Sequence, residues 1–225
     1  MKRAACALLF VAGCSAGERY AEYGANPFPD IKTVAVLPVL NQTGQPTFDG
    51  EEYGNILASE MLKWTGFQAV RPAAIRSLHE PLPRSVEDAV KLGRRLKVDA
   101  VLVALITDHD PYDPPKVAVS VQFLRSGARP VSSADVDALT RSASWRKGPF
   151  PMSPERAGHW IAAFEGVYDA HSLPVRRELA AYARAQEGSD TAYLGEREFL
   201  AVAPRFFQFV SNQLLRRLFE VASTP

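Results

Sequence analysis

The densest group of side chains that could bind a metal ion lies in the segment Thr107–Asp113. It holds three carboxylates and one imidazole, at Asp108, His109, Asp110 and Asp113, and such oxygen and nitrogen ligands hold divalent metals. The segment follows an expected strand, where ligands often bind in open α/β sheets. The alternative is a solvated connection in which Asp and Pro form turns. Because no further His or Glu follows at a fixed spacing, we predict no metal or cofactor and keep these four residues only as metal candidates.

Other catalytic patterns are not found. The sequence has no Walker A motif, no Gly-x-Ser-x-Gly motif and no His-Glu-x-x-His motif. Gly44 and Gly50 flank the first expected strand-to-helix loop, a position that can cradle a phosphate, but no Lys lies near them. We therefore predict a protein that is not an enzyme. The alternative is a metal- or small-ligand-binding protein, or an enzyme, that uses the Asp108–Asp113 loop.

The thiol of Cys14 is a second group that could do chemistry. Met1-Lys2-Arg3 is a short basic segment, and Ala4–Ala12 is an apolar run of nine residues. A run of that length is too short to cross a bilayer, which needs about 20 residues. A basic start followed by a short apolar run is typical of a secretory signal peptide.

The residues that end this run, Val11-Ala12-Gly13-Cys14, resemble a bacterial lipobox. The resemblance implies that Cys14 receives a lipid, with fatty acids such as palmitate, and that the signal peptide 1–13 is removed. Cys6 would leave with it, so no disulfide could form within the mature chain. Ser15, at the second mature position, implies the outer membrane, facing the periplasm. The alternative is an ordinary buried cysteine after an apolar helix.

The composition is that of a globular protein. The chain has 225 residues, of which 47% are hydrophobic and 23% charged, which is too apolar for disorder. Its 26 basic and 25 acidic side chains give a formal net charge of +1. A balance this close to zero argues against nucleic acid as a partner.

Residues 31–126 are expected to form an α/β domain, with a small mixed sheet in the order β-α-β-α-β-β. Strands are expected at 31–37, 67–70, 98–106 and 116–124, with helices capped by Asp49 and Ser85 and a short one at 73–78. The run 98–106 is apolar except for Asp99, which indicates a strand buried on both faces. The alternation in 116–124 predicts a half-exposed strand antiparallel to it.

The flanking regions differ from this domain. Residues 14–30 hold Gly and Pro without periodicity and are read as a lipidated tether, although Tyr20, Tyr23 and Phe28 could instead pack on the domain. Residues 127–225 are expected to form a helical region on or beside it. The expected helices begin at Ser132 and Ser153, the second with a stripe from Ala157 to Tyr168, and continue at 173–186 and 195–219, with a kink or break at Pro204.

Two aromatic side chains in this helical region are candidates for partner contact. Phe206 and Phe209 fit one helical face, so Phe207 must lie on another, and the helix is either buried on both sides or offers a face to a partner. Arg216 and Arg217 follow and could rim such a patch. Trp145, between charged residues, could be an exposed anchor. For both aromatic residues the alternative is ordinary packing.

Several short segments resemble a family of envelope α/β domains. The segments are Ile31–Pro38, Asn41–Gly44, Ser85–Gly93 and Val98–Val103, and the family includes the N-terminal domain of TolB, the curli-secretion lipoprotein CsgG and LpoB-type activators of penicillin-binding proteins. The resemblance implies a non-catalytic protein that acts through protein contacts. A CsgG-like secretion-pore subunit is disfavoured, because only Arg125–Arg129 separates the fourth strand from the next element, whereas such a pore needs long hairpins.

We therefore predict a lipoprotein of the cell envelope, held on a membrane through Cys14. Its domain is expected to act as a protein-binding or assembly module, with an envelope protein or further copies of itself as the partner.

Overall fold

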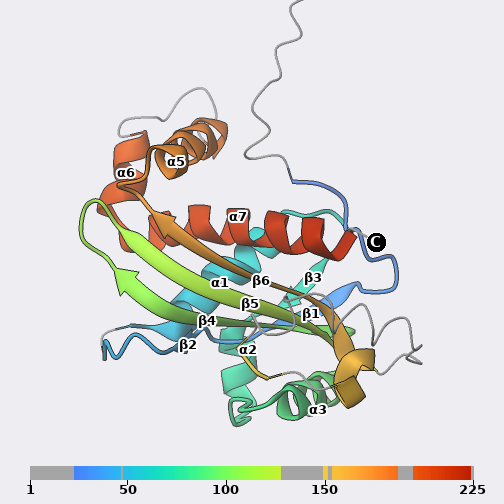
Figure 1. The fold of residues 1–225 in the computed structure, drawn as a ribbon. Coiled ribbons are helices and arrows are strands. Elements are labelled where there is room, and N and C mark those ends of the chain that lie inside the picture. Colours follow the sequence, from blue (N-terminus) through green and yellow to red (C-terminus); the bar gives the residue numbers. More distant parts are fainter. Residues whose placement is uncertain (1–22, 47, 128–148, 152–153, 187–194, 224–225) are drawn as a thin grey trace, which may run out of the picture.

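The computed structural model describes residues 23–46, 48–127, 149–151, 154–186 and 195–223 (Figure 1). The strands are β1 (Thr33–Val36), β2 (Leu40–Asn41), β3 (Gln68–Val70), β4 (Ala100–Asp110), β5 (Lys116–Arg125) and β6 (Trp160–Asp169). The helices are α1 (Gly50–Met61), α2 (Pro72–Ser77), α3 (Val86–Leu96), the 3₁₀ helix η2 (Pro154–His159), α5 (Leu173–Gln186), α6 (Glu196–Ala201) and α7 (Ala203–Ser223). None of these helices is long and apolar enough to cross a membrane.

The strands form one mixed sheet, which confirms the predicted α/β class. Its order is β3-β1-β4-β5-β6, with β2 paired to β4. β1 runs parallel to β3 and β4, whereas β4, β5 and β6 are successively antiparallel. The predicted succession of strands and helices between residues 31 and 126 is therefore present, and β6 is an additional strand from the C-terminal region.

Helices cover both faces of the sheet, as Figure 1 shows. Val34 and Val36 of β1 join a core cluster with α1 and α7, whereas Ala35 and Leu37 join a cluster with α2 and α3. The alternation follows from the two-residue period of a strand. β4 contributes to both clusters, which confirms the prediction of a strand buried on both faces.

The predicted helix caps are present. The side chain of Asp49 accepts hydrogen bonds from the backbone N–H groups of Glu51 and Glu52, and that of Ser85 accepts one from Asp88. Each cap satisfies donors that a helix start leaves unpaired. α5 lies at the predicted residues, and the predicted break in the last helix occurs at Val202, just before Pro204.

The prediction of a helix from Ser153 to Tyr168 is wrong. Only the short η2 forms there, followed by β6, in which Ala162 and Tyr168 are buried and Val167 is exposed. The apolar spacing fits a helix, but these residues are rich in aromatic and β-branched types, and β5 offers an edge to pair with. Tertiary pairing therefore overrides the local pattern.

β5 is also more buried than its alternation suggests. Ser120 and Gln122, expected to face solvent, are 6% and 0% exposed. The Gln122 amide exchanges two hydrogen bonds of 3.3 Å with the backbone of Phe150. The chain after the fourth strand thus returns to cover this face, and a satisfied polar side chain can be buried there.

The end of the expected tether is docked on the domain. The Asn26 N–H donates to the Thr65 carbonyl over 2.9 Å, and Ala25 and Thr65 form an isolated parallel bridge. The ring of Phe28 packs edge-on against Phe123 and Phe219. The alternative interpretation of the tether therefore holds from Tyr23 onward.

Candidate functional site

A buried carboxylate, Glu60, organises the largest polar cluster that we find among the described residues. It lies in the last turn of α1 and is 0% exposed. It accepts hydrogen bonds from Tyr23 Oη at 2.7 Å, Lys63 Nζ at 2.6 Å, Gln208 Nε2 at 3.1 Å and Tyr182 Oη at 3.2 Å. The donors come from the N-terminal segment, the turn after α1, α7 and α5, so one carboxylate of α1 joins several parts of the fold.

The electrostatics of this cluster keep the donors protonated. Burial, followed by the Glu60 charge, raises the pKa of both Tyr23 and Tyr182. Burial acts to lower the pKa of Lys63, but its bonds to Glu60 and Tyr23 leave it raised overall. Lys63 and Gln186 also bond to Tyr23 Oη, each over 3.1 Å. An ammonium, two phenols and an amide thus satisfy the carboxylate, an arrangement suited to holding segments together.

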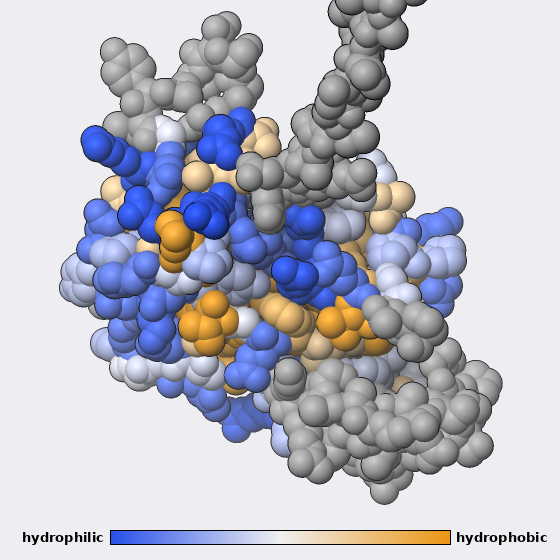
Figure 2. All heavy atoms as spheres, turned by 45° about the horizontal axis from the view of Figure 1, so that its top comes forward, coloured by the Kyte–Doolittle hydropathy of each residue, from blue (hydrophilic) through white to orange (hydrophobic). Residues whose placement is uncertain are grey.

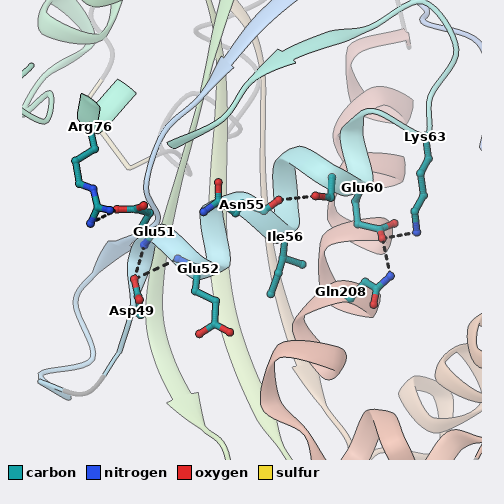
Figure 3. A pocket seen from close by; sticks show the side chains of 10 residues that line it. Asp49, Glu51, Glu52, Asn55, Ile56, Glu60, Lys63, Arg76 and Gln208 are labelled. Carbon is teal, nitrogen blue, oxygen red and sulfur yellow. Dashed lines mark hydrogen bonds and ion pairs between the residues drawn. The ribbon is translucent and has the colours of Figure 1, made fainter. Parts of the chain in front are cut away.

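A cavity of about 570 Å³ opens beside this cluster, along the outer side of α1 (Figure 3). Its walls carry mainly acidic and amide groups, with one cation at each end. The lining residues are Asp49, Glu51, Glu52, Asn55, Ile56, Ser59, Glu60, Lys63, Arg76 and Gln208. Arg76 Nη1 pairs with Glu51 Oε2 at 2.8 Å. Asn55 Oδ1 is shielded from water and has no hydrogen-bond partner among the described residues.

The predicted metal candidates do not converge. Asp108 and Asp110 are exposed at the end of β4, whereas His109 between them is 7% exposed, as the two-residue period of a strand requires. Asp108 Oδ2 pairs with Lys116 Nζ of β5 at 2.8 Å, and Asp113 lies beyond the strand in the connection to β5. Among the described residues no group of three or more His, Cys, Asp or Glu side chains could hold a metal ion. Asp108, His109, Asp110 and Asp113 therefore do not form a group of metal ligands in this structure.

His109 instead belongs to an aromatic cluster. Its Nε2 lies 3.1 Å from Tyr53 Oη, its Nδ1 lies 3.2 Å from Gln45 Oε1, and its ring packs edge-on against Phe48. Because Gln45 Oε1 can only accept, Nδ1 carries the proton and Nε2 accepts from the Tyr53 hydroxyl. Burial lowers the pKa of His109, against the opposing charges of Asp110 and Asp108.

The partner candidates on α7 are placed differently from one another. Phe207 is 0% exposed and packs 4.6 Å, centroid to centroid, from Tyr53. The helix is thus buried on both sides, and the prediction that Phe207 contacts a partner is wrong. Arg217 is exposed and pairs with Glu220 at 3.0 Å, while Arg216 is half-buried. Neither rims an exposed Phe207.

Three predictions lie outside the described residues: the lipidation site Cys14, the anchor Trp145 and the short helix from Ser132. The Glu60 cluster was not predicted. One signal for it exists, because Glu60 falls on the same helical stripe as the apolar Leu57 and Met61, and a carboxylate on a core-facing stripe must find partners.

No family model and no curated protein matches the chain. Solved structures that resemble it include the hypothetical protein CT253 from Chlamydia trachomatis, at 13% identity and a TM-score of 0.42, with 85% of this chain and 98% of that one covered. Lipoprotein GNA1162 from Neisseria meningitidis resembles the chain at 15% identity and a TM-score of 0.39, with 83% of this chain and 98% of that one covered. The LpoB C-terminal domain from Salmonella enterica resembles it at 13% identity and a TM-score of 0.39, with 64% of this chain and 87% of that one covered. One of these neighbours is named as a lipoprotein.

Proposed function

We propose that this chain is a lipoprotein of the bacterial envelope, anchored through an acylated Cys14, whose domain is a non-catalytic module that binds another envelope protein. The proposal places it on the outer membrane, facing the periplasm. The observation that carries it is the docking of the N-terminal segment, because a lipobox-like sequence precedes a segment whose far end is built into the domain.

The docking limits the distance between lipid and domain. Tyr23 is fixed by Glu60, Lys63 and Gln186, so only the nine residue steps from Cys14 to Tyr23 separate the lipid from the docked segment. Nine residue steps span at most about 30 Å when fully extended. An acylated Cys14 would therefore hold the domain close to the bilayer.

The polar chemistry of the described residues fits a binding role. Glu60 is satisfied by hydrogen bonds that hold the docked segment, and His109 is committed to Tyr53 and Gln45. The face of the molecule that Figure 2 shows is mostly hydrophilic, with hydrophobic side chains in small separate groups. A partner on that face would meet polar side chains more than one broad apolar surface.

The anchor is tested by Cys14→Ala in the native host, with Cys6→Ala as the matched control. In the wild type and the control we expect a protein that begins at Cys14, carries fatty acids and sediments with membranes. Two or more acyl chains give stable attachment. Cys14→Ala should accumulate as an uncleaved precursor that starts at Met1. Intact-mass spectrometry distinguishes the forms, and cleavage and release of Cys14→Ala like the wild type would overturn the proposal.

A further inference from the structure

Two further cavities adjoin the one along α1. A second cavity, of about 330 Å³, shares Glu51 and Arg76 with it, and a third, of about 840 Å³, shares Leu82 with the second. Their lining residues place them in a row from α1, past Pro38 after the carboxyl end of β1, to α3, and we call this row of adjoining cavities the groove. The carboxyl ends of strands are where open α/β sheets often bind ligands.

One end of this groove is acidic. Asp49, Glu51, Glu52 and Glu60 line it, opposed by Lys63 and Arg76. Arg76 pairs with Glu51 and Lys63 with Glu60. Within the described part of the chain the Glu52 carboxylate has no hydrogen bond or ion pair, and Figure 3 shows it pointing away from the Asp49–Glu51–Arg76 group. The Glu52 carboxylate therefore makes this end suited to a donor-bearing, cationic group.

The other end is basic. Arg84, Lys91, Arg94 and Arg95 line it, with Asp88 as the opposing carboxylate. Three of these cations have partners: Lys91 pairs with Glu87, Arg95 with Glu80, and Arg94 Nε donates to the Ser126 carbonyl. The guanidinium of Arg84 has none among the residues that the structure describes. This end therefore favours a carboxylate-bearing group.

The stretch between the two ends combines apolar residues with charges that are already paired. Pro38, Val39, Ile75 and Leu82 line the second cavity together with Glu51, Arg76 and Glu80. Glu51 pairs with Arg76 and Glu80 with Arg95, and Leu82 is 47% exposed. A leucine this open, between two charged ends, loses its contact with water only when another apolar group covers it.

We propose that this groove binds an extended segment of a partner protein that is acidic at one end, apolar in the middle and basic at the other. The inference rests on the proposed function, because it names the partner's binding site and the chemistry of the bound segment. Charge complementarity sets the direction of the segment: its acidic end lies against α3 and its basic end against α1, beside the docked N-terminal segment. The opposite direction would place like charges together at both ends.

The experiment uses the whole chain as isolated from its host in neutral detergent, whether or not it is acylated, and a fluorescein-labelled peptide with an aspartate, a leucine and a lysine block. We expect saturable binding by fluorescence anisotropy, weakened by added salt. A peptide of the same composition with its residues interleaved should bind about tenfold more weakly. The double variant Arg84→Glu/Lys91→Glu should also lose about tenfold, whereas Arg177→Glu, an exposed cation on α5, should bind like the wild type.

A charge exchange makes the test specific. A peptide whose aspartate block is replaced by lysine should bind the double variant better than it binds the wild type. Three results would each overturn the inference: the wild-type protein binds the block peptide and the interleaved peptide equally well, it shows no saturable binding, or the exchanged peptide does not restore binding to the double variant. None of these results bears on membrane attachment, which the Cys14→Ala experiment measures separately, so the two proposals can fail independently.

Discussion

Glu60 and His109 are both buried ionisable groups at α1, yet the fold accommodates them in opposite ways. Glu60 belongs to the helix, and His109 of β4 contacts its Tyr53. The Glu60 carboxylate has an ammonium, two phenols and an amide as donors. The His109 imidazole meets aromatic rings and one neutral partner on each nitrogen. The first site is built around a charge, and the second favours the uncharged form.

The difference shows what burial demands of each group. A buried charge is tolerated when it is paired and its remaining lone pairs accept hydrogen bonds. A group with an accessible neutral form can instead give up its proton, which the lowered pKa of His109 reflects. The first solution recruits residues from several segments and ties them together, whereas the second needs only a fitting pocket. Removing the two groups should therefore have different consequences.

The largest effect is expected for Glu60→Ala. The substitution leaves Tyr23 and Tyr182 without their shared acceptor, and a buried polar group left unsatisfied lowers the free energy of unfolding by about 1–3 kcal/mol. The side chain of Lys63 is 32% exposed, so its ammonium can turn to water. Urea unfolding of the whole chain, followed by circular dichroism, measures the change.

Two controls make the Glu60 result specific. Glu60→Gln keeps an oxygen acceptor and should be less destabilising, and Glu165→Ala, which removes an exposed carboxylate on β6, should change stability little. If Glu60→Ala lost no more than Glu165→Ala, the cluster would not hold the segments together.

How much of the fold and of these sites can be predicted from the sequence depends on how far apart along the chain the interacting residues lie. The caps at Asp49 and Ser85, and the buried strand from Ala100, depend on neighbours along the chain and were predicted. β6 was missed because pairing with β5 outweighs its helical spacing. The Glu60 cluster draws on Tyr23, Tyr182 and Gln208, more than a hundred residues apart at the extremes, so no local pattern could join them.

His109 is expected to have a smaller effect on the free energy of unfolding than Glu60, and this effect depends on pH. The folded-state pKa of His109 lies below the ordinary value of 6.5 because burial disfavours its charged form. Below about pH 6.5 the unfolded chain therefore binds a proton that the folded chain does not. The free energy of unfolding should thus fall as the pH drops from 7 toward the folded pKa, and level off for this group below it.

His109→Gln tests this sign. Stability measured by urea unfolding at several pH values from 7 downward should depend less on pH in the variant than in the wild type. His79→Gln, which removes an exposed histidine in the turn after α2, is the matched control. An unchanged slope in His109→Gln would contradict the view that His109 is held neutral.

The smallest expected effect is that of a divalent metal on the His109 region. Asp108 is paired with Lys116 on the exposed side, His109 faces the aromatic rings, and no third ligand converges with them among the described residues. A metal that binds only the native state must raise the melting temperature. Adding Zn²⁺ or Mg²⁺ to the whole chain should therefore leave the melting temperature unchanged. A saturable rise that Asp108→Asn removes and Asp88→Asn on α3 keeps would show that these side chains do converge on a metal. His109 would then owe its burial to coordination, and its comparison with Glu60 would have to be drawn between two charged sites.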